Sequence, residues 1–402
     1  MRVLLVSDFY PPAPGGLEAH VRRLGHGLVR AGHDVEVVAG GPADPGAAPR
    51  DDDGIPVHRG GTSVGRLPGA YQQADRPFHP PWPDREFQRR ISQVAGSFGP
   101  DVVHAHGWSE FSAAAVCRRR HPLVVTLHDY GLRCPKKNLL RGEHECTSGR
   151  GMRCVTCPGA EQGAAKRAIL STALGRTVPR LDGRVALFLA VSEHVAARHR
   201  ETRLQASVEV IPNFLDLPAG EFQAPAGTGI LYVGPADRHK GLSVLLAARA
   251  RLPAALAPLV VVGAGAGTAA GTGTAGVEFA GRLTGDALWQ RYQAAAIVVV
   301  PSIWPEPCPT VVLEALASGR PVVGSRTGGI PDLVEHGRTG LLVPPDDPVA
   351  LAAAIAELLG DRDRLRAMAR AAWQSARSFD TTAVVARIES TYGKVLAEWS
   401  PR

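Results

Sequence analysis

The sequence predicts an α/β protein made of two doubly wound domains. The chain has 402 residues, which suits about two ordinary domains. Short apolar runs alternate with helical patterns along it, as parallel sheets covered by helices on both faces require. A proline-rich stretch, Pro212–Pro225, separates two such series. We therefore expect an N-terminal domain over 1–215 and a C-terminal domain over 216–381, with a last helix, 382–402, packing back on the first domain.

The composition is that of a globular protein with a basic surface. Hydrophobic residues make up 45% and charged residues 21%, and the net charge is +7. This charge fits either a solvated Arg-rich surface or an affinity for anionic substrates or an anionic membrane face. Basic residues do not alternate with aromatic ones, so we expect no nucleic-acid binding. No apolar run is long enough to span a membrane, so we expect a cytoplasmic protein, with peripheral contact at the inner membrane face left open.

The first series begins with a buried strand near the N-terminus. The expected strands are Val3–Val6, Val35–Val38, Val102–His104, Val124–Leu127, Val185–Val191 and Val208–Ile211. The expected helices are Leu17–Arg30, Glu110–Arg119, Gln162–Thr177 and Glu193–Thr202. Two segments rich in Pro, Gly and Asp, Ala43–Pro56 and Ser63–Pro83, are expected to be long loops or a partly ordered surface.

The second series repeats the pattern. The expected strands are Ile230–Val233, Leu259–Val262, Val277–Phe279, Ile297–Val300, Pro321–Val323 and Gly340–Val343. The expected helices are Leu242–Arg251, Gly285–Ala294, Val311–Ser318, Val349–Leu359, Arg362–Ser378 and Thr382–Trp399. Ligands of such domains bind at the carboxyl ends of the strands, so we look for the site there.

One stretch of the second series, Ile297–Pro345, has the form of a ligand site. A buried strand leads through a proline-rich loop into a short helix, which a second strand and a Gly-rich loop follow. The start of that helix offers free backbone N–H groups and a positive dipole end, which suit a phosphate. Glu306 and Glu314 stand on either side of this helix start. Carboxylates repel phosphate, so we expect them to hold sugar or ribose hydroxyls.

Three glycine-rich loops could each be a ligand-binding loop or a plain turn. Gly15-Gly16 precedes a predicted helix. The pair either lets ligand oxygens approach the backbone closely or forms a simple flexible turn. A second loop carries Arg238 and Lys240 at a helix start, where they could clamp a diphosphate, or is a plain polar loop. The third, Gly263–Gly267, is similar to a dinucleotide fingerprint but lacks its spacing, so we interpret it as a permissive turn.

Taken in chain order, these pieces resemble the retaining glycosyltransferases of family 4, which have the GT-B fold. That fold is two Rossmann-like doubly wound domains facing across a cleft. The matching segments run in family order over nearly the whole chain, and they are Pro11-Pro12 to Glu18, Gly32–Val35, Asp101–His106, Thr126–His128, Ala190–Ser192, Val210–Asn213, Lys240-Gly241, Gly281-Arg282 and the Glu306–Glu314 pair.

The resemblance implies a role for each matching residue. Glu306 would bind hydroxyls of the donor sugar, Glu314 the ribose, and His128 would stand at the sugar. Arg282 would lie near the base. The diphosphate would be held by Lys240 and by backbone N–H groups of two loops, at Gly15, Gly16, Pro309, Thr310 and Val311.

The activity that the resemblance implies is transfer of a hexose-type sugar, with retention and without a catalytic metal. The donor would be UDP- or GDP-linked, and the acceptor a lipid-linked intermediate, a polysaccharide or a small metabolite. Lys240 and Arg238, with backbone N–H groups, would stabilise the leaving diphosphate. Where the family usually has Gly-Arg this chain has Gly234-Pro235, so either Arg238 supplies that charge or Lys240 acts alone and diphosphate binding is weaker. A nucleotide-sugar epimerase of the same fold and an inactive nucleotide-sugar-binding protein are the alternatives.

Four cysteines follow His128 in a polar, basic insert. Cys134, Cys146, Cys154 and Cys157 have the spacing C-x11-C-x7-C-x2-C. A C-x2-C pair with two further cysteines matches a structural zinc site, while free thiols, disulfides and an iron–sulfur or redox centre are the alternatives. We expect this insert to shape the acceptor side of the site. His104 and His106, by contrast, fit either core histidines or acceptor contacts, and Cys308 fits a small packing residue.

Overall fold

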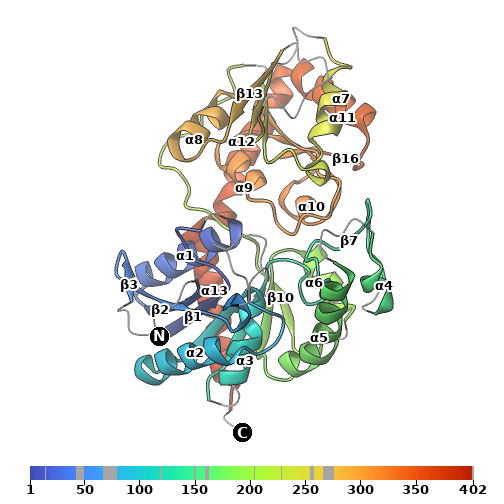
Figure 1. The fold of residues 1–402 in the computed structure, drawn as a ribbon. Helices are drawn as coiled ribbons and strands as arrows, with labels where there is room; N and C mark the ends of the chain where they lie inside the picture. The colour runs from blue at the N-terminus through green and yellow to red at the C-terminus, as the bar shows by residue number, and fades with distance from the viewer. Residues whose placement is uncertain are drawn as a thin grey trace. The chain divides into compact units, whose positions relative to one another are not determined.

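The structure is a computed structural model of the chain (Figure 1). The residues that it describes are 1–13, 15–41, 49–66, 79–117, 120–148, 151–158, 163–202, 204–227, 229–253, 258–265 and 276–400. The chain divides into two compact units. Unit 1 comprises Met1–Pro212 with Thr381–Arg402, and unit 2 comprises Asn213–Asp380. Within the described residues, no helix is long and apolar enough to cross a membrane.

Unit 1 is built on an eight-stranded sheet. The strands are β1 (Arg2–Ser7), β2 (Asp34–Gly40), β3 (Arg50–Asp52), β4 (Ile55–Gly60), β5 (Val102–His106), β6 (Leu123–Leu127), β9 (Leu187–Ala190) and β10 (Val208–Val210). Their order is β10-β9-β6-β5-β1-β2-β4-β3, and only β3 and β4 pair antiparallel. The central strands β1, β5 and β6 are almost entirely buried, as apolar runs in a parallel sheet should be.

Helices pack around this sheet (Figure 1). They are α1 (Gly16–Arg30), α2 (Arg85–Phe98), α3 (Glu110–Cys117), α5 (Ala164–Asp182), α6 (Glu193–Arg200) and the C-terminal α13 (Thr381–Glu398). Helix α13 packs on α1. Its Tyr392 hydroxyl lies 2.6 Å from His104 Nδ1, and its Glu389 lies 2.6 Å from His33 Nε2. These contacts make the last helix part of unit 1.

The structure differs from the sequence prediction in the two expected loops. The first expected loop, Ala43–Pro56, contains β3 and the start of β4. Its residues 43–48 lie outside the described part of the chain. In Ser63–Pro83 only a 3-10 turn, Val64–Arg66, and the last residues are described. Helix α2 follows it and was not predicted, although Asp84 caps its first turn through the N–H groups of Glu86 and Phe87.

Unit 2 is built on a six-stranded, all-parallel sheet. The strands are β11 (Ile230–Val233), β12 (Leu259–Val262), β13 (Val277–Gly281), β14 (Ile297–Val300), β15 (Val322–Ser325) and β16 (Gly340–Val343), in the order β13-β12-β11-β14-β15-β16. The helices are α7 (Leu242–Arg249), α8 (Gly285–Ala294), α9 (Thr310–Ala317), α10 (Ile330–Leu333), α11 (Pro348–Gly360) and α12 (Arg362–Ser375). The predicted alternation of strands and helices is confirmed in both units.

Candidate functional site

The Glu306 carboxylate and the Lys240 ammonium form an ion pair at the carboxyl edge of the unit 2 sheet. Lys240 ends a 3-10 turn, Arg238–Lys240, that follows β11, while Glu306 lies in the loop that follows β14. These two strands are neighbours, so their carboxyl ends bring the loops together. Lys240 Nζ lies 2.9 Å from each oxygen of Glu306, and the Ser302 hydroxyl donates to the same carboxylate. The sequence identified both residues but not Ser302.

Two glycines hold these loops at their close approach. Gly241, with φ of +75°, lies against the backbone of Pro301, where a Cβ atom would come within 1.8 Å of the carbonyl oxygen. Gly328, with φ of +57°, lies against Glu306, where a Cβ would come within 2.3–2.4 Å of its backbone O and N. Gly329 N donates to Glu306 O at 2.7 Å. The backbone of Glu306 is therefore fixed by a loop that only glycine can form.

Glu314 lies one helix turn beyond the start of α9 and contacts a residue that the sequence analysis did not single out. The hydroxyl of Tyr292, in α8, donates to Glu314 Oε2 at 2.6 Å. Burial, and then the nearby Glu314 carboxylate, raise the pKa of Tyr292 well above its usual value, so this phenol stays a donor. The hydrogen bond orients the Glu314 carboxylate.

The N-terminus of α9 has the features of an anion site. Its N-cap is Pro309, and no side chain caps its first turn. The N–H of Val312 bonds back to Pro309 O, whereas those of Thr310 and Val311 stand at the start of the helix, at its positive dipole end. Next to it, Cys308 is buried, and burial raises the pKa of its thiol to about 12, as expected of a packing residue.

The two arginines predicted at the donor site are exposed. Arg238 opens the 3-10 turn before Lys240, and Arg282 follows the edge strand β13. Pro235, which stands where the family usually has arginine, accepts a hydrogen bond at 2.8 Å from the Tyr232 hydroxyl through its carbonyl oxygen. The roles of Arg238 and Arg282 remain predictions.

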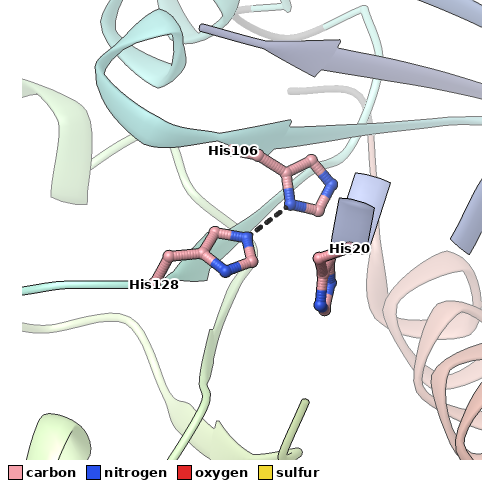
Figure 2. A group of neighbouring side chains, drawn as sticks. All are labelled: His20, His106 and His128. Atoms are coloured by element: carbon pink, nitrogen blue, oxygen red, sulfur yellow. Dashed lines mark hydrogen bonds between the residues drawn. The ribbon is translucent and has the colours of Figure 1, made fainter. Parts of the chain in front are cut away.

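Unit 1 gathers three histidines where β5 and β6 end (Figure 2). His106 is the last residue of β5, His128 follows β6, and His20 comes from α1. His106 Nδ1 and His128 Nε2 share a hydrogen bond of 2.9 Å. The His20 ring meets the His128 ring edge-on with centroids 4.6 Å apart. One ligand nitrogen from each of the three lies within 4.8 Å of the others, so the set could also hold a metal ion.

Two of these histidines, His106 and His128, are held in the neutral form. Burial, and then neighbouring histidines, lower the pKa of both His106 and His128 well below the usual value. His106 is fully buried, and its Nε2 atom has no hydrogen-bond partner among the described residues. His104 is different, because Tyr392 and Thr126 satisfy both of its nitrogens at 2.6 and 2.7 Å. His104 is therefore a core histidine.

The loops near this cluster carry the other residues predicted in unit 1. Gly15 and Gly16 form the start of α1, where no side chain caps the helix and a Cβ on Gly16 would meet nothing within 4 Å. At the end of β1 the buried Asp8 accepts the N–H groups of Trp108 and Ser109 at 3.0 and 2.6 Å. This carboxylate fixes the turn that follows His106, and no motif in the sequence marks it for such a role.

The four cysteines of the insert line one partly open cavity. All four are free thiols. All four sulfurs lie in the part of the chain that the structure describes, and no three of them are all within 4.8 Å of one another. The zinc site predicted from their spacing therefore remains a prediction.

Comparison with known families covers most of the chain. The model described as Glycosyltransferase Family 4 matches residues 14–218, and the model described as Glycosyl transferases group 1 matches residues 227–361. The chain belongs to glycosyltransferase family 4. Among curated relatives, a D-inositol 3-phosphate glycosyltransferase of Catenulispora acidiphila is 31% identical over 76% of this chain and 75% of its own. A glycogen synthase of Mycobacterium tuberculosis is 29% identical over 98% and 94%.

Solved structures show the same architecture. A sucrose-phosphate synthase from Thermosynechococcus elongatus is 22% identical with a TM-score of 0.71, covering 98% of this chain and 99% of its own. HepE of Anabaena, solved in complex with UDP, is 20% identical with a TM-score of 0.70, covering 98% and 100%. The fold of this family 4 member is thus GT-B, with two Rossmann-like domains, as the sequence predicted.

Proposed function

We propose that this family 4 glycosyltransferase moves a hexose-type sugar from a UDP- or GDP-linked donor to an acceptor hydroxyl, with retention and without a metal in the reaction. The observation that carries the proposal is the Lys240–Glu306 pair beside the α9 N-terminus, at one sheet edge. An ammonium and free N–H groups suit a diphosphate, and a carboxylate suits sugar hydroxyls. One site thus offers what a nucleotide sugar requires.

Each residue of this edge takes one part of the donor. Lys240, with the Thr310 and Val311 N–H groups, binds the diphosphate, and Arg238 adds positive charge. Glu306 accepts from sugar hydroxyls, while Glu314, oriented by Tyr292, accepts from the ribose. Arg282 lies near the base. In unit 1, Gly15 and Gly16 add N–H groups to the diphosphate.

The chemistry is an exchange of one C–O bond for another. The bond between the anomeric carbon and the β-phosphate oxygen breaks, and its electron pair leaves with the nucleoside diphosphate. The acceptor oxygen attacks the anomeric carbon on the same face, and its proton passes to the leaving phosphate. The barrier falls because the cations and N–H groups stabilise the negative charge that develops on that phosphate. No side chain is needed as a general base.

His128 acts at the sugar as a neutral hydrogen-bonding group. Its lowered pKa keeps the imidazole uncharged. The hydrogen bond that it shares with His106 fixes the orientation of the ring. If His106 Nδ1 donates, His128 carries its proton on Nδ1 and offers that N–H to the substrate.

The acceptor is a lipid-linked intermediate, a polysaccharide or a small polyol. Relatives of this chain are named for acceptors of all three kinds, and they include a phosphatidyl-myo-inositol mannosyltransferase of Mycolicibacterium smegmatis, 28% identical over 98% of this chain. A lipid-linked acceptor would bring the enzyme to the inner face of the membrane. The basic net charge of +7 favours such contact with anionic lipids.

A panel of UDP- and GDP-sugars, with nucleoside diphosphate release measured in EDTA, tests the proposal. We expect release from one donor, and its loss in Glu306→Gln. The matched control is Glu335→Gln, because Glu335 is an exposed carboxylate of the same unit that forms an ion pair with Arg338. Conversion of the donor to an isomeric nucleotide sugar would favour the epimerase. Donor binding without any turnover would favour the inactive binding protein.

A further inference from the structure

The insert that follows His128 has too little regular structure to be stable by itself. It spans residues 129–158, and its described elements are two strands of two residues each, β7 (Leu140–Arg141) and β8 (His144–Glu145), and the four-residue helix α4 (Met152–Val155). The side chain of Met152 is 80% exposed. The first half of the insert is anchored by the buried side chains of Tyr130, Leu132, Leu139 and Leu140, whereas none of residues 151–158 is buried. This second half therefore needs a constraint other than a hydrophobic core.

The cysteines of the insert converge from three separate parts of it. Cys134 lies in the turn after β6, Cys146 follows β8, and the other pair, Cys154 and Cys157, belongs to α4 and the turn behind it. All four line the same cavity. The two remaining cysteines of the chain, Cys117 and Cys308, are buried elsewhere. The fold therefore collects one specific set of thiols at one place.

The charges around this cavity suit thiolates bound to a metal. The ionisable side chains lining it, apart from the cysteines, are all cationic in the part of the chain that the structure describes: Arg133, Lys136, Arg141, Arg153 and Arg167. Four thiolates around one divalent cation carry a net charge of about −2, which such side chains offset.

We propose that Cys134, Cys146, Cys154 and Cys157 bind one structural zinc ion, which closes the insert. Zinc is the expected ion because a tetrahedral set of four thiolates selects it over Mg²⁺ and Ca²⁺. With Zn–S bonds of about 2.3 Å the sulfurs would stand about 3.8 Å apart. No three of the four sulfurs all lie within 4.8 Å of one another, so metal binding would draw the short segments that carry them inward and fix their positions.

A second set of metal-ligand side chains in unit 1 is the main rival. His20, His106 and His128 bring their ligand nitrogens within 4.8 Å (Figure 2). Neutral imidazoles are good zinc ligands. However, His106 Nδ1 and His128 Nε2 already share a proton at 2.9 Å, and a metal would have to displace it. The histidine cluster is therefore the alternative location that the experiment must separate.

Metal analysis of the purified full chain tests the proposal, independently of any transferase activity. We expect about one zinc per chain, its release when a mercurial titrates the thiols, and retention of zinc in Cys117→Ala and His106→Leu. Cys157→Ser should lose most of the zinc. A cobalt-substituted wild-type chain should show the intense absorption of tetrahedral cobalt–thiolate coordination, which gives a result even if Cys157→Ser does not fold.

Three outcomes would overturn it. One is a chain without stoichiometric zinc in which all four thiols titrate freely. Another is zinc that Cys157→Ser retains and His106→Leu loses, which would place the metal at the histidines. The third is iron with inorganic sulfide in place of zinc, which would make the insert an iron–sulfur centre.

Discussion

Replacing Lys240 by methionine should destabilise unit 2 and abolish transfer by separable routes. Lys240 Nζ contacts both Glu306 oxygens at 2.9 Å, where the attraction is roughly 6 kcal/mol at an effective dielectric constant of about 20, before desolvation is subtracted. Removing one partner of a fully buried pair costs about 3–5 kcal/mol. Because the Lys240 side chain is 26% exposed and that of Glu306 only 7%, we expect about 2–3 kcal/mol for Lys240→Met.

The double variant Lys240→Met/Glu306→Gln separates stability from catalysis. The double variant leaves no buried charge unpaired, so it should regain most of the stability that Lys240→Met loses. We expect a coupling energy between the two substitutions of about 2 kcal/mol. Activity should not return, because the leaving diphosphate still lacks its cation; comparable losses in oxyanion sites lower kcat about 10²–10³-fold. The exposed pair Arg338–Glu335 is the control, and Arg338→Met should cost under about 0.5 kcal/mol.

Hydrogen exchange of peptides covering β14 and α9 is the assay for stability, because it reports local opening in a protein of two units. Diphosphate release reports activity in the same samples. A double variant as unstable as Lys240→Met would refute the ion-pair reasoning. A double variant with restored activity would refute the role of Lys240 at the diphosphate.

Three further perturbations test other parts of the site. Gly328→Ala should cost roughly 1–2 kcal/mol for its left-handed backbone alone, and activity should fall further because its Cβ must displace the Glu306 backbone, to which it would come within 2.3 Å. His106→Leu should lower kcat about 10-fold with little change in the donor KM, since it removes the hydrogen bond that orients His128. Glu110→Gln should stabilise the chain increasingly as pH rises above about 4.5, by about 1.4 kcal/mol per pH unit. Burial, and then Asp8, raise the pKa of Glu110 in the folded chain well above its usual value. Between the unfolded and the folded pKa, the unfolded chain releases this proton while the folded chain keeps it, so the wild-type chain loses stability as pH rises and the glutamine variant does not.

Each of these has a matched control. Gly337 also has a positive φ, of +83°, but a Cβ there meets nothing within 4 Å, so Gly337→Ala should keep activity; an equal loss would contradict the packing explanation. His106→Asn returns a nitrogen near the Nδ1 position and should recover part of kcat, and no recovery would make His106 merely structural. For Glu110, a stability difference that is constant between pH 5 and pH 8 would show that its carboxyl is not protonated in the fold.

The sequence predicted the strands well because β1, β5, β6 and β14 are short apolar runs with little polar interruption. It did not predict β4, whose run Ile55–Gly60 contains proline, histidine and arginine. It did not predict α2 either, although Asp84 and the left-handed Gly99 mark both ends of this helix. A polar, Arg-rich surface helix after a proline-rich stretch shows a weak apolar pattern, and its caps are the signal that could have located it.

Local sequence pattern singles out residues of the candidate site but does not predict the contacts between them. Lys240 and Glu306 stand out in the sequence because each lies in a loop between a strand and a helix. Their ion pair forms because β11 and β14 are neighbours in the sheet, and this strand order cannot be read from local sequence. Tyr292 and His20 are not recognisable from local pattern, since each acts from a helix distant in sequence from its partner. The same holds for Ser302, an ordinary loop residue until Glu306 is placed beside it.

Equilibrium binding of nucleotides to the full chain tests the diphosphate site most directly. Calorimetric titration with UDP, UMP, GDP and GMP in EDTA separates the β-phosphate from the rest of the ligand. We predict that one diphosphate binds at least about 10-fold more tightly than its monophosphate, a difference of about 1.4 kcal/mol, and that Lys240→Met removes most of this difference while Arg338→Met keeps it. Equal affinity for the diphosphate and the monophosphate, or a difference that survives in Lys240→Met, would contradict the proposed site.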